Sequence, residues 1–371
     1  MKRAEKHLRY SATNRRPQLD EARYGSLIKL LILVGSLALA SAAAVFFIVP
    51  LLRSIPFQKE EAVPDSGEQT PVWSEKIRTL SETGWIGEVS EWNGSFLYSS
   101  GSSAESLTRL NRLHLETGES ESVSVPLSGD SIRYPYENDE WILYGDYSSD
   151  GSGAIRMLEK KSGEDSTLYT FKESAPPLFC SFPYVVFTAR TDADSYTLTV
   201  LDVRSRSSVA AARFSGPEYG TSAPAVRKGQ IVYSNLNPEN PKTSMLRRIS
   251  LSDGARSDLD PGIYIHDPVL TENSVLAISG LHSPDSVLYE IRPDGSCEPI
   301  AHSVVRFGCS GNSPVFSANG TIFRVENGSG RTVALSETGA VCELVGTTDS
   351  SVIWMDRSDP ERIVFRYLTL D

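Results

Sequence analysis

The chain has 371 residues, with 36 Lys or Arg, 47 Asp or Glu and four Cys, and a formal net charge of −11. This length allows two ordinary domains or one large repetitive domain, and four cysteines are too few for a disulfide scaffold. Residues 1–53 carry nine basic side chains against three acidic ones, whereas residues 54–371 carry 27 against 44. The acidic part excludes nucleic acid as its partner, because phosphate repels carboxylate.

Residues 1–25 form a basic tail that is too short to fold alone, and residues 26–52 form an apolar segment. Within it, residues 30–52 are 23 residues without a charged side chain. A helix rising about 1.5 Å per residue spans roughly 35 Å over this run, enough to cross a bilayer core of about 30 Å. Because the basic residues precede the run, the positive-inside rule predicts a single-pass plasma-membrane protein with a cytoplasmic N-terminus and an extracytoplasmic C-terminal domain.

A cleaved signal peptide is the alternative, since small-residue sites occur at 38–42. The apolar run continues past them, however, beyond the usual h-region of about 7–15 residues. Ser36, Ala40 and Ala44 lie on one face of the predicted helix. Such a small-residue stripe favours a helix-mediated dimer, and the alternative is Ala-rich filler without a partner.

Residues 53–73 are rich in Pro, Glu, Gln and Ser, which predicts a flexible linker. Residues 74–371 then contain seven short β-rich runs bounded by turn-forming residues. The runs are 94–100, 140–146, 183–189, 229–235, 273–279, 320–326 and 350–356. Their starts lie 46, 43, 46, 44, 47 and 30 residues apart, and a spacing near 45 is typical of four-stranded propeller blades.

Each run sits in the same local order of elements. A strand that often contains proline and a tight turn come before it, and a polar loop, an alternating third strand and a short fourth strand follow. The sequence therefore predicts an all-β fold, a β-propeller of seven four-stranded blades preceded by one transmembrane α-helix. Six or eight blades and an all-β sandwich pair are the alternatives. Because the chain ends on a third strand, we expect a strand within 75–80 to complete the last blade.

This order of strands resembles the TolB-like (WD-type) family of propeller repeats. The segments that carry the resemblance are 222–254 and 266–295, each with a Pro-containing first strand and a third strand that ends in Asp-Gly. The resemblance implies a propeller that binds proteins or peptides, and it is almost uninformative about activity.

Motifs of common enzyme classes are absent, including His-Glu-x-x-His, the Walker loop and Gly-x-Ser-x-Gly. The five histidines show no ligand spacing, and we interpret them as isolated. Cys180, Cys297, Cys309 and Cys342 allow zero, one or two disulfides, and we interpret them as free thiols, with Cys297 and Cys342 in fourth strands. Sequons at 93, 319 and 327 are interpreted as turns, with glycosylation as the alternative.

The sharpest local signal is Asp146, Ser148 and Asp150 followed by Gly151, since oxygen ligands at positions 1, 3 and 5 suit a calcium loop. Met157 stands where such a loop needs a bidentate acid. We therefore interpret the segment as a polar hairpin loop, with a calcium site at these three residues as the alternative. The sequence predicts no other cofactor.

Polar loops recur at equivalent positions of several blades. They lie at 146–151, 191–194, 237–240, 283–285 and 356–359. In a propeller these loops share one rim, which suits a basic partner or cations. The alternative is that solvent exposure alone explains their polarity.

Together these features favour a membrane-anchored module of the cell envelope that binds a protein, peptide or glycan and is not an enzyme. One alternative is an enzyme, a glycan lyase or hydrolase with its site at the central channel. A cluster of His, Asp and Arg at the channel mouth, or paired carboxylates, is the feature that favours this alternative. The other alternative is a sensor that signals through the cytoplasmic tail.

Overall fold

The computed structural model describes residues 77–80, 84–192, 195–215, 222–280, 285–327, 329–337, 340–359 and 362–370. The chain divides into two compact units, Met1–Gln69 and Thr70–Asp371, and all of these residues belong to the second unit. The predicted cytoplasmic tail, membrane helix and linker therefore lie outside the described residues. Within the part of the chain that the structure describes, no helix is long and apolar enough to cross a membrane.

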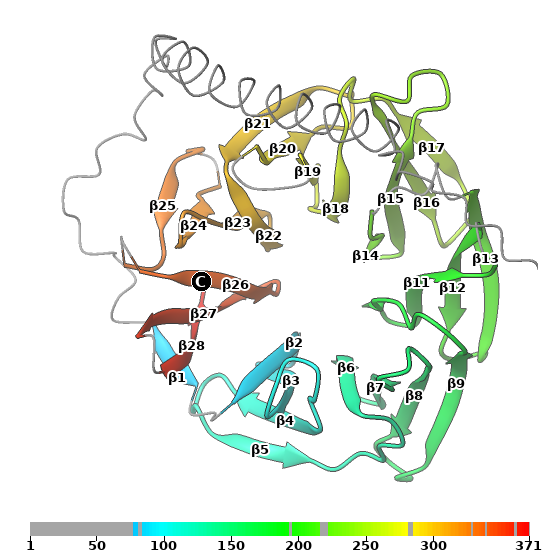
Figure 1. The fold of residues 1–371 in the computed structure, drawn as a ribbon, viewed down its shortest axis with the longest axis vertical. Helices are drawn as coiled ribbons and strands as arrows, with labels where there is room; N and C mark the ends of the chain where they lie inside the picture. The colour runs from blue at the N-terminus through cyan, green and yellow to red at the C-terminus, as the bar shows by residue number, and fades with distance from the viewer. Residues whose placement is uncertain are drawn as a thin grey trace, which may run out of the picture. The chain divides into compact units, whose positions relative to one another are not determined.

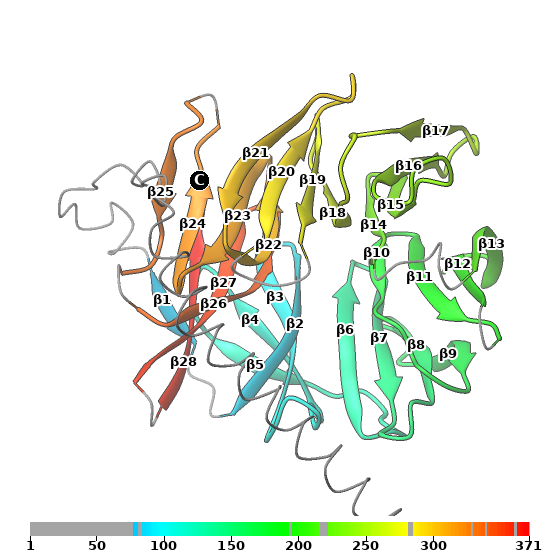
Figure 2. The ribbon, with the colours of Figure 1, turned by 45° about the horizontal axis from the view of Figure 1, so that its top comes forward.

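The described residues form seven antiparallel sheets of four strands each. Figure 1 shows these sheets arranged as blades around a common axis, with one edge strand of each blade facing the centre. Figure 2 shows the ring tilted, with strands β6 to β9 of one blade following one another outwards. The predicted propeller with seven blades is confirmed, and the alternatives of six blades, eight blades or a sandwich are wrong.

The strands of every blade follow one another in chain order from the innermost outwards, except that β1 is the outermost strand of blade 7. Blade 1 consists of β2 (Trp85–Trp92), β3 (Ser95–Gly101), β4 (Arg109–His114) and β5 (Ser120–Val123). Blade 2 consists of β6 (Ser131–Glu137), β7 (Trp141–Tyr147), β8 (Gly153–Glu159) and β9 (Asp165–Phe171). Blade 3 consists of β10 (Phe179–Ser181), β11 (Tyr184–Arg190), β12 (Ser195–Asp202) and β13 (Ser207–Ser215). Blade 4 consists of β14 (Ala225–Arg227), β15 (Gln230–Leu236), β16 (Ser244–Ser250) and β17 (Arg256–Leu259). Blade 5 consists of β18 (His266–Leu270), β19 (Val275–Ser279), β20 (Val287–Ile291) and β21 (Cys297–His302). Blade 6 consists of β22 (Val304–Ser310), β23 (Ser313–Ala318), β24 (Thr321–Val325) and β25 (Thr332–Ala334). Blade 7 consists of β26 (Cys342–Thr347), β27 (Ser351–Asp359), β28 (Arg362–Thr369) and β1 (Arg78–Leu80).

The second strand of each blade explains the β-rich runs of the sequence. All seven residues of β3 are buried, as are six of the seven in β7. A strand in this position packs against neighbouring blades with both faces, so it reads as a continuous apolar run rather than an alternating one. The outer strand β5 has no buried residue, which fits its polar sequence.

The sequence-based assignment is wrong by one strand in blade 6. The run 320–326 is predicted to be a second strand, but it forms β24, the third strand, and β23 takes the second place. The proline of β23 makes this strand resemble the Pro-containing innermost strands of other blades, whereas β22 has no proline. The second strands of blades 5 to 7 begin at Val275, Ser313 and Ser351, so their spacing is 38 residues in both intervals.

The ring is closed by β1, as the sequence predicts. This strand pairs antiparallel with β28, so the last blade combines residues from both ends of the propeller. Arg78 of β1 also donates hydrogen bonds to the carbonyl oxygens of Leu115 and Glu116 in blade 1, at 2.9 and 3.0 Å. Separating blade 7 from blade 1 therefore requires breaking a sheet as well as side-chain packing.

The core of the described residues consists of seven hydrophobic clusters, one at each interface between neighbouring blades. The cluster between blades 7 and 1, for example, joins Leu80, Phe96 and Phe365. Because the apolar side chains pack between blades, the space on the axis is left to the residues of the innermost strands.

The closing strand provides a matched pair of substitutions. Leu80 is 5% exposed in the cluster between blades 7 and 1, whereas its neighbour Thr79 is exposed. We expect Leu80→Ala to lower the free energy of unfolding by about 2–5 kcal/mol, because it leaves a cavity in this cluster. Thr79→Ala should change it by less than about 0.5 kcal/mol. Denaturant unfolding of both variants checks this, and equal effects would contradict the proposed role of β1.

Candidate functional site

Residues of blades 5, 6 and 7 next to the central axis line a cavity of about 700 Å³, which we call the first chamber. Its walls come from the ends of β18 to β20 in blade 5, from β22 in blade 6 and from β26 in blade 7. Lining residues include His266, Asp267, Arg306, Phe307 and Thr347. This volume lies within the range of about 300–1,000 Å³ that is typical of small-ligand sites.

A second chamber of about 610 Å³ adjoins the first. It is lined by β10, β14, β18, β22 and β26 and the turns that follow them. Both chambers share Asp267, Phe307, Gly346 and Thr347, which we call the waist. The two chambers are therefore parts of one axial cavity, and Asp267 is the ionisable group common to both.

Asp267 is held in an unusual backbone conformation. Its φ angle is 50°, and the pairing of β18 with β19 shifts register between His266 and Val269. Its Oδ1 accepts a hydrogen bond from the backbone N–H of Ala223 at 2.8 Å, and its own N–H donates to Ser222 Oγ at 3.1 Å. A positive φ is uncommon for residues other than glycine but is tolerated by Asp and Asn. The bulge and these hydrogen bonds together fix the carboxylate at the waist.

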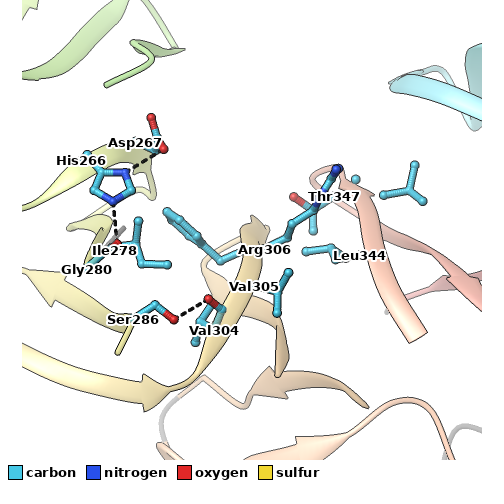
Figure 3. Close-up of a pocket in the computed structure, with 13 residues that line it drawn as sticks. His266, Asp267, Ile278, Gly280, Ser286, Val304, Val305, Arg306, Leu344 and Thr347 are labelled. Carbon is cyan, nitrogen blue, oxygen red and sulfur yellow. Dashed lines mark hydrogen bonds and ion pairs between the residues drawn. The ribbon is translucent and has the colours of Figure 1, made fainter. Parts of the chain in front are cut away.

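His266 supports this carboxylate from behind. Its Nδ1 lies 2.8 Å from Asp267 Oδ2 and its Nε2 lies 3.0 Å from the Gly280 carbonyl oxygen, and both contacts are drawn in Figure 3. Because a carboxylate and a carbonyl oxygen are both acceptors, the two contacts favour the imidazolium form, in which both ring nitrogens donate. The His266 side chain is 12% exposed and that of Asp267 is 43% exposed. Asp267 is thus the member of the pair that can touch a ligand.

The pKa of His266 is the result of opposing effects. Burial disfavours the charged form, but the hydrogen bonds to the Asp267 carboxylate and the Gly280 carbonyl, with the attraction of Asp267, outweigh it. The pKa is therefore raised above 6.5.

Arg306 supplies a second cation on another side of the first chamber. Figure 3 shows its side chain running from β22 towards Thr347, away from His266 and Asp267. Its Nε lies 3.0 Å from Glu343 Oε1, and its side chain is 57% exposed. Among the interactions of the described residues, its two terminal NH2 groups have no partner. These groups can bind a carboxylate through two parallel hydrogen bonds.

The lining of the second chamber includes apolar residues, two thiols and one tightly held arginine besides Asp267 at the waist. Arg227 of β14 donates to the carbonyl oxygens of Leu270 and Gly311 at 3.2 and 3.0 Å. Its Nη2 lies 2.8 Å from Asp349 Oδ1. Cys309 lies beside it, with Sγ 4.0 Å from Arg227 Nη1.

The predicted calcium loop lies far from this cavity in the sequence and in the fold, between β7 and β8. Asp146 is buried, and its carboxylate accepts hydrogen bonds from the N–H groups of Ser128 and Gly129 at 2.9 and 2.7 Å. Asp150 accepts one from the N–H of Ser152. The structure does not bring Asp146, Ser148 and Asp150 together with other His, Cys, Asp or Glu side chains in a metal-binding group within the described residues. The calcium site stays a prediction.

The interpretation of all histidines as isolated is wrong for His266, because its partner is the next residue in the chain. A His-Asp-Pro sequence in an innermost strand was the available signal, since proline and a bulge turn this strand towards the axis. All four cysteines are free thiols. Cys342 lies in β26, an innermost strand, and not in a fourth strand as predicted, because of the shift by one strand in blade 6.

Four segments of the predicted polar rim fall at loops between second and third strands, whereas residues 356–359 form the end of the second strand β27 and are not a loop as predicted. Residues 193–194, 281–284 and 360–361 of these loops lie outside the described residues. Gly280, which lines the first chamber, begins one of the loops. The first chamber therefore lies towards this face, which we call the loop face. The second lies towards the face of the turns between first and second strands, which we call the turn face.

No family model and no curated protein matches the chain. Solved structures that it resembles include the β-propeller domain of the Trilobed protease from Pyrococcus furiosus, with TM-score 0.56, 9% identity, 77% of this chain and 96% of that chain covered. Another is an oligogalacturonate lyase in complex with manganese, with TM-score 0.55, 10% identity and coverage of 80% and 91%. A third is a prolyl endopeptidase, with TM-score 0.55, 12% identity and coverage of 73% and 46%. The match thus spans less than half of that peptidase.

TolB from Acinetobacter baumannii is also among the matches, with TM-score 0.41, 10% identity, 76% of this chain and 79% of that chain covered. At this TM-score the likeness carries no argument about function. The seven-bladed propeller fold that the sequence predicts is shown by the structure itself.

The prediction that the chain is not an enzyme is contradicted by these comparisons. The similar structures include peptidases and a lyase rather than binding modules alone. Identities of 9–12% establish a common fold and nothing finer. The activity of this chain is therefore argued from its own cavity.

The charged state of His266 can be tested directly. Because folding raises its pKa, its contribution to stability is present in full below 6.5 and is lost as the pH rises through the folded-state pKa. We expect ring resonances of His266 in NMR spectra to titrate above 6.5 and the pKa to fall in Asp267→Asn. A pKa that does not respond to Asp267→Asn would show that the pair is not formed in solution.

Proposed function

We propose that the protein is an enzyme that cleaves an acidic glycan in the first chamber, as a lyase or hydrolase. The observation that carries this proposal is that the Asp267–His266 pair and Arg306 lie on different walls of the same cavity. The presence of His, Asp and Arg side chains around one cavity at the central channel is the feature that distinguishes this enzyme from a simple binding module.

Asp267 is the proposed general base. Its carboxylate is partly exposed to the cavity and is held by the N–H of Ala223 and by the His266 imidazolium. In a lyase it takes the proton from the carbon next to the substrate carboxylate, a C=C bond forms as the bond to the leaving sugar oxygen breaks, and that oxygen takes a proton from water. In a hydrolase it takes a proton from the attacking water, whose oxygen forms the new bond as the glycosidic bond breaks, and the leaving oxygen again takes a proton from solvent. His266 is a positioning residue, because its own nitrogens are occupied by Asp267 and Gly280.

Arg306 is the proposed recognition group for the carboxylate of an acidic sugar. Its terminal NH2 groups offer a planar pair of donors, and the flexible side chain is exposed to the chamber. Neutralising that carboxylate also makes the neighbouring proton easier to remove, because negative charge develops there as the proton leaves. Phe307 adds an apolar surface next to Arg306 in the same wall.

The similar oligogalacturonate lyase supports the choice of a glycan. The match covers 91% of that protein, so a propeller of similar extent is nearly the whole of an enzyme there. That structure is a complex with manganese. In the described part of this chain no three His, Cys, Asp or Glu side chains form a metal-binding group. The proposed mechanism therefore uses no step through a metal.

The decisive variant is Asp267→Asn. Asparagine tolerates the positive φ and keeps an oxygen to accept the hydrogen bond from Ala223, so the shape of the cavity should be retained. Loss of the base should lower kcat by about 10²–10⁴-fold. The assay follows polygalacturonate cleavage, where a new conjugated double bond marks elimination and reducing ends alone mark hydrolysis.

His302→Gln is the matched control, since His302 is exposed in β21 of the same blade and lines neither chamber. Its activity should equal that of the wild type. Arg306→Lys keeps the charge but loses the paired donors, and we expect KM to rise about tenfold with a smaller change in kcat. Wild-type activity in Asp267→Asn would overturn the proposed role of the carboxylate.

We also propose that residues 26–52 anchor this enzyme in the plasma membrane, with residues 1–25 in the cytoplasm and the propeller outside. The uncharged run of 23 residues and the basic residues before it support this topology. An envelope glycan is then the natural substrate within reach of residues 74–371.

A protease protection experiment tests the anchor. In intact cells with an accessible cell surface, added protease should degrade an epitope fused after residue 371 and leave one fused at residue 1 intact. Replacing two residues of the apolar run by arginine, as in Leu39→Arg with Val45→Arg, should release the protein from membranes, because each charge costs about 2.5–3.5 kcal/mol at the centre of a spanning helix. Membrane association that survives this change would contradict the proposal.

A further inference from the structure

The axial cavity has a direction, because three innermost strands pass along both chambers in the same order. In β18, residues 266–267 line the first chamber and 267–270 line the second. In β22 the corresponding residues are 304–307 and 307–309, and around β26 they are 344–347 and 346–349. An extended ligand lying along these strands would therefore enter from the loop face, pass Asp267 at the waist and reach the turn face.

The far end of this path is crossed by an ion pair. Arg227 belongs to blade 4 and Asp349 follows β26 of blade 7, and their side chains are 2.8 Å apart. In a ring of seven blades, blades 4 and 7 are three steps apart, which is the largest separation that the ring allows. A direct contact between them therefore reaches over part of the central space, past the turns of blades 5 and 6.

Arg227 is fixed in this crossing position. Besides the contact with Asp349, its Nη1 donates to the carbonyl oxygens of Leu270 in blade 5 and Gly311 in blade 6. Its side chain is 17% exposed, whereas that of Asp349 is 78% exposed at the turn face. A charged guanidinium with three acceptors is costly to displace.

We infer that the Arg227–Asp349 pair closes the axial cavity at the turn face, so that the enzyme binds the end of a glycan chain and not an internal segment. The inference rests on the proposed function for the class of ligand. Each chamber alone has the volume of a small-ligand site, so a ligand that fills both is an oligomer. Because Asp267 lies at the waist, cleavage there would release a short product from the second chamber.

Thiol labelling tests the closure without any substrate. Cys309 lines the second chamber next to Arg227 and is a free thiol. In full-length Arg227→Met, iodoacetamide should label Cys309 about tenfold faster than in the wild type, because access from the turn face is opened. Burial raises the pKa of this thiol and Arg227 lowers it, so removing Arg227 alone would slow the reaction. Faster labelling of Cys309 in Arg227→Met would therefore show that the thiol has become more accessible.

Lys228→Met is the matched control. Lys228 is the next residue, also lines the second chamber and also forms an ion pair, with Glu272 at 2.7 Å, but this pair joins only the neighbouring blades 4 and 5. Its labelling rate should equal that of the wild type. Asp349→Ala removes only the exposed partner and should accelerate labelling in the same direction if Arg227→Met fails to fold. An unchanged rate in both axial variants overturns the closure.

The products of polygalacturonate cleavage test the consequence for the substrate. The wild type should release short oligomers of one narrow size from the first turnover, with little loss of viscosity. Arg227→Met should release longer products and lower the viscosity faster for each bond cleaved. Cleavage by the wild type at internal positions would overturn chain-end binding while leaving the proposed function intact. Absence of any cleavage would overturn the proposed function, and the labelling rates would still decide the closure.

Discussion

The packing of neighbouring blades through seven separate hydrophobic clusters is the constraint on which the rest of the structure depends. Each cluster joins two adjacent blades, mainly through their second and third strands, so most apolar side chains of the described residues pack between blades. The innermost strands are then free to present polar groups to the axis. The pairing of β1 with β28 extends this arrangement across the junction of the two ends of the propeller.

The cavity follows from irregularities in the innermost strands. Pairing shifts register in β2, β6, β18, β22 and β26, and the residues at two of these bulges, Tyr134 and Asp267, have a positive φ. Bulges of this kind redirect side chains and are frequent next to functional sites. In blade 5 the bulge places Asp267 between two chambers, and the same turn of the chain sets His266 behind it.

The charges of the cavity are arranged in pairs rather than as a field of one sign. His266 contacts Asp267, Arg227 contacts Asp349, and Arg306 contacts Glu343 through Nε. These contacts differ in what they leave open. Arg227 is held by blades 5, 6 and 7 through both terminal NH2 groups, whereas Arg306 keeps its two terminal NH2 groups for a ligand. The same residue type therefore serves as a closure in one chamber and as a recognition group in the other.

The periodic spacing of β-rich runs was enough to predict a seven-bladed propeller and its completion by the strand before blade 1. This is because hydrophobic pattern and turns are local properties that repeat once per blade. The local pattern gave a wrong assignment in blade 6, because the proline of β23 makes this second strand resemble an innermost strand. The strands assigned after it are therefore displaced by one position in the blade. The local pattern also failed for His266, because its His-Asp-Pro sequence matches none of the catalytic or metal-binding motifs. The contacts of Arg227 with blades 5, 6 and 7 join residues 43 to 122 positions apart, and only closure of the ring brings them together.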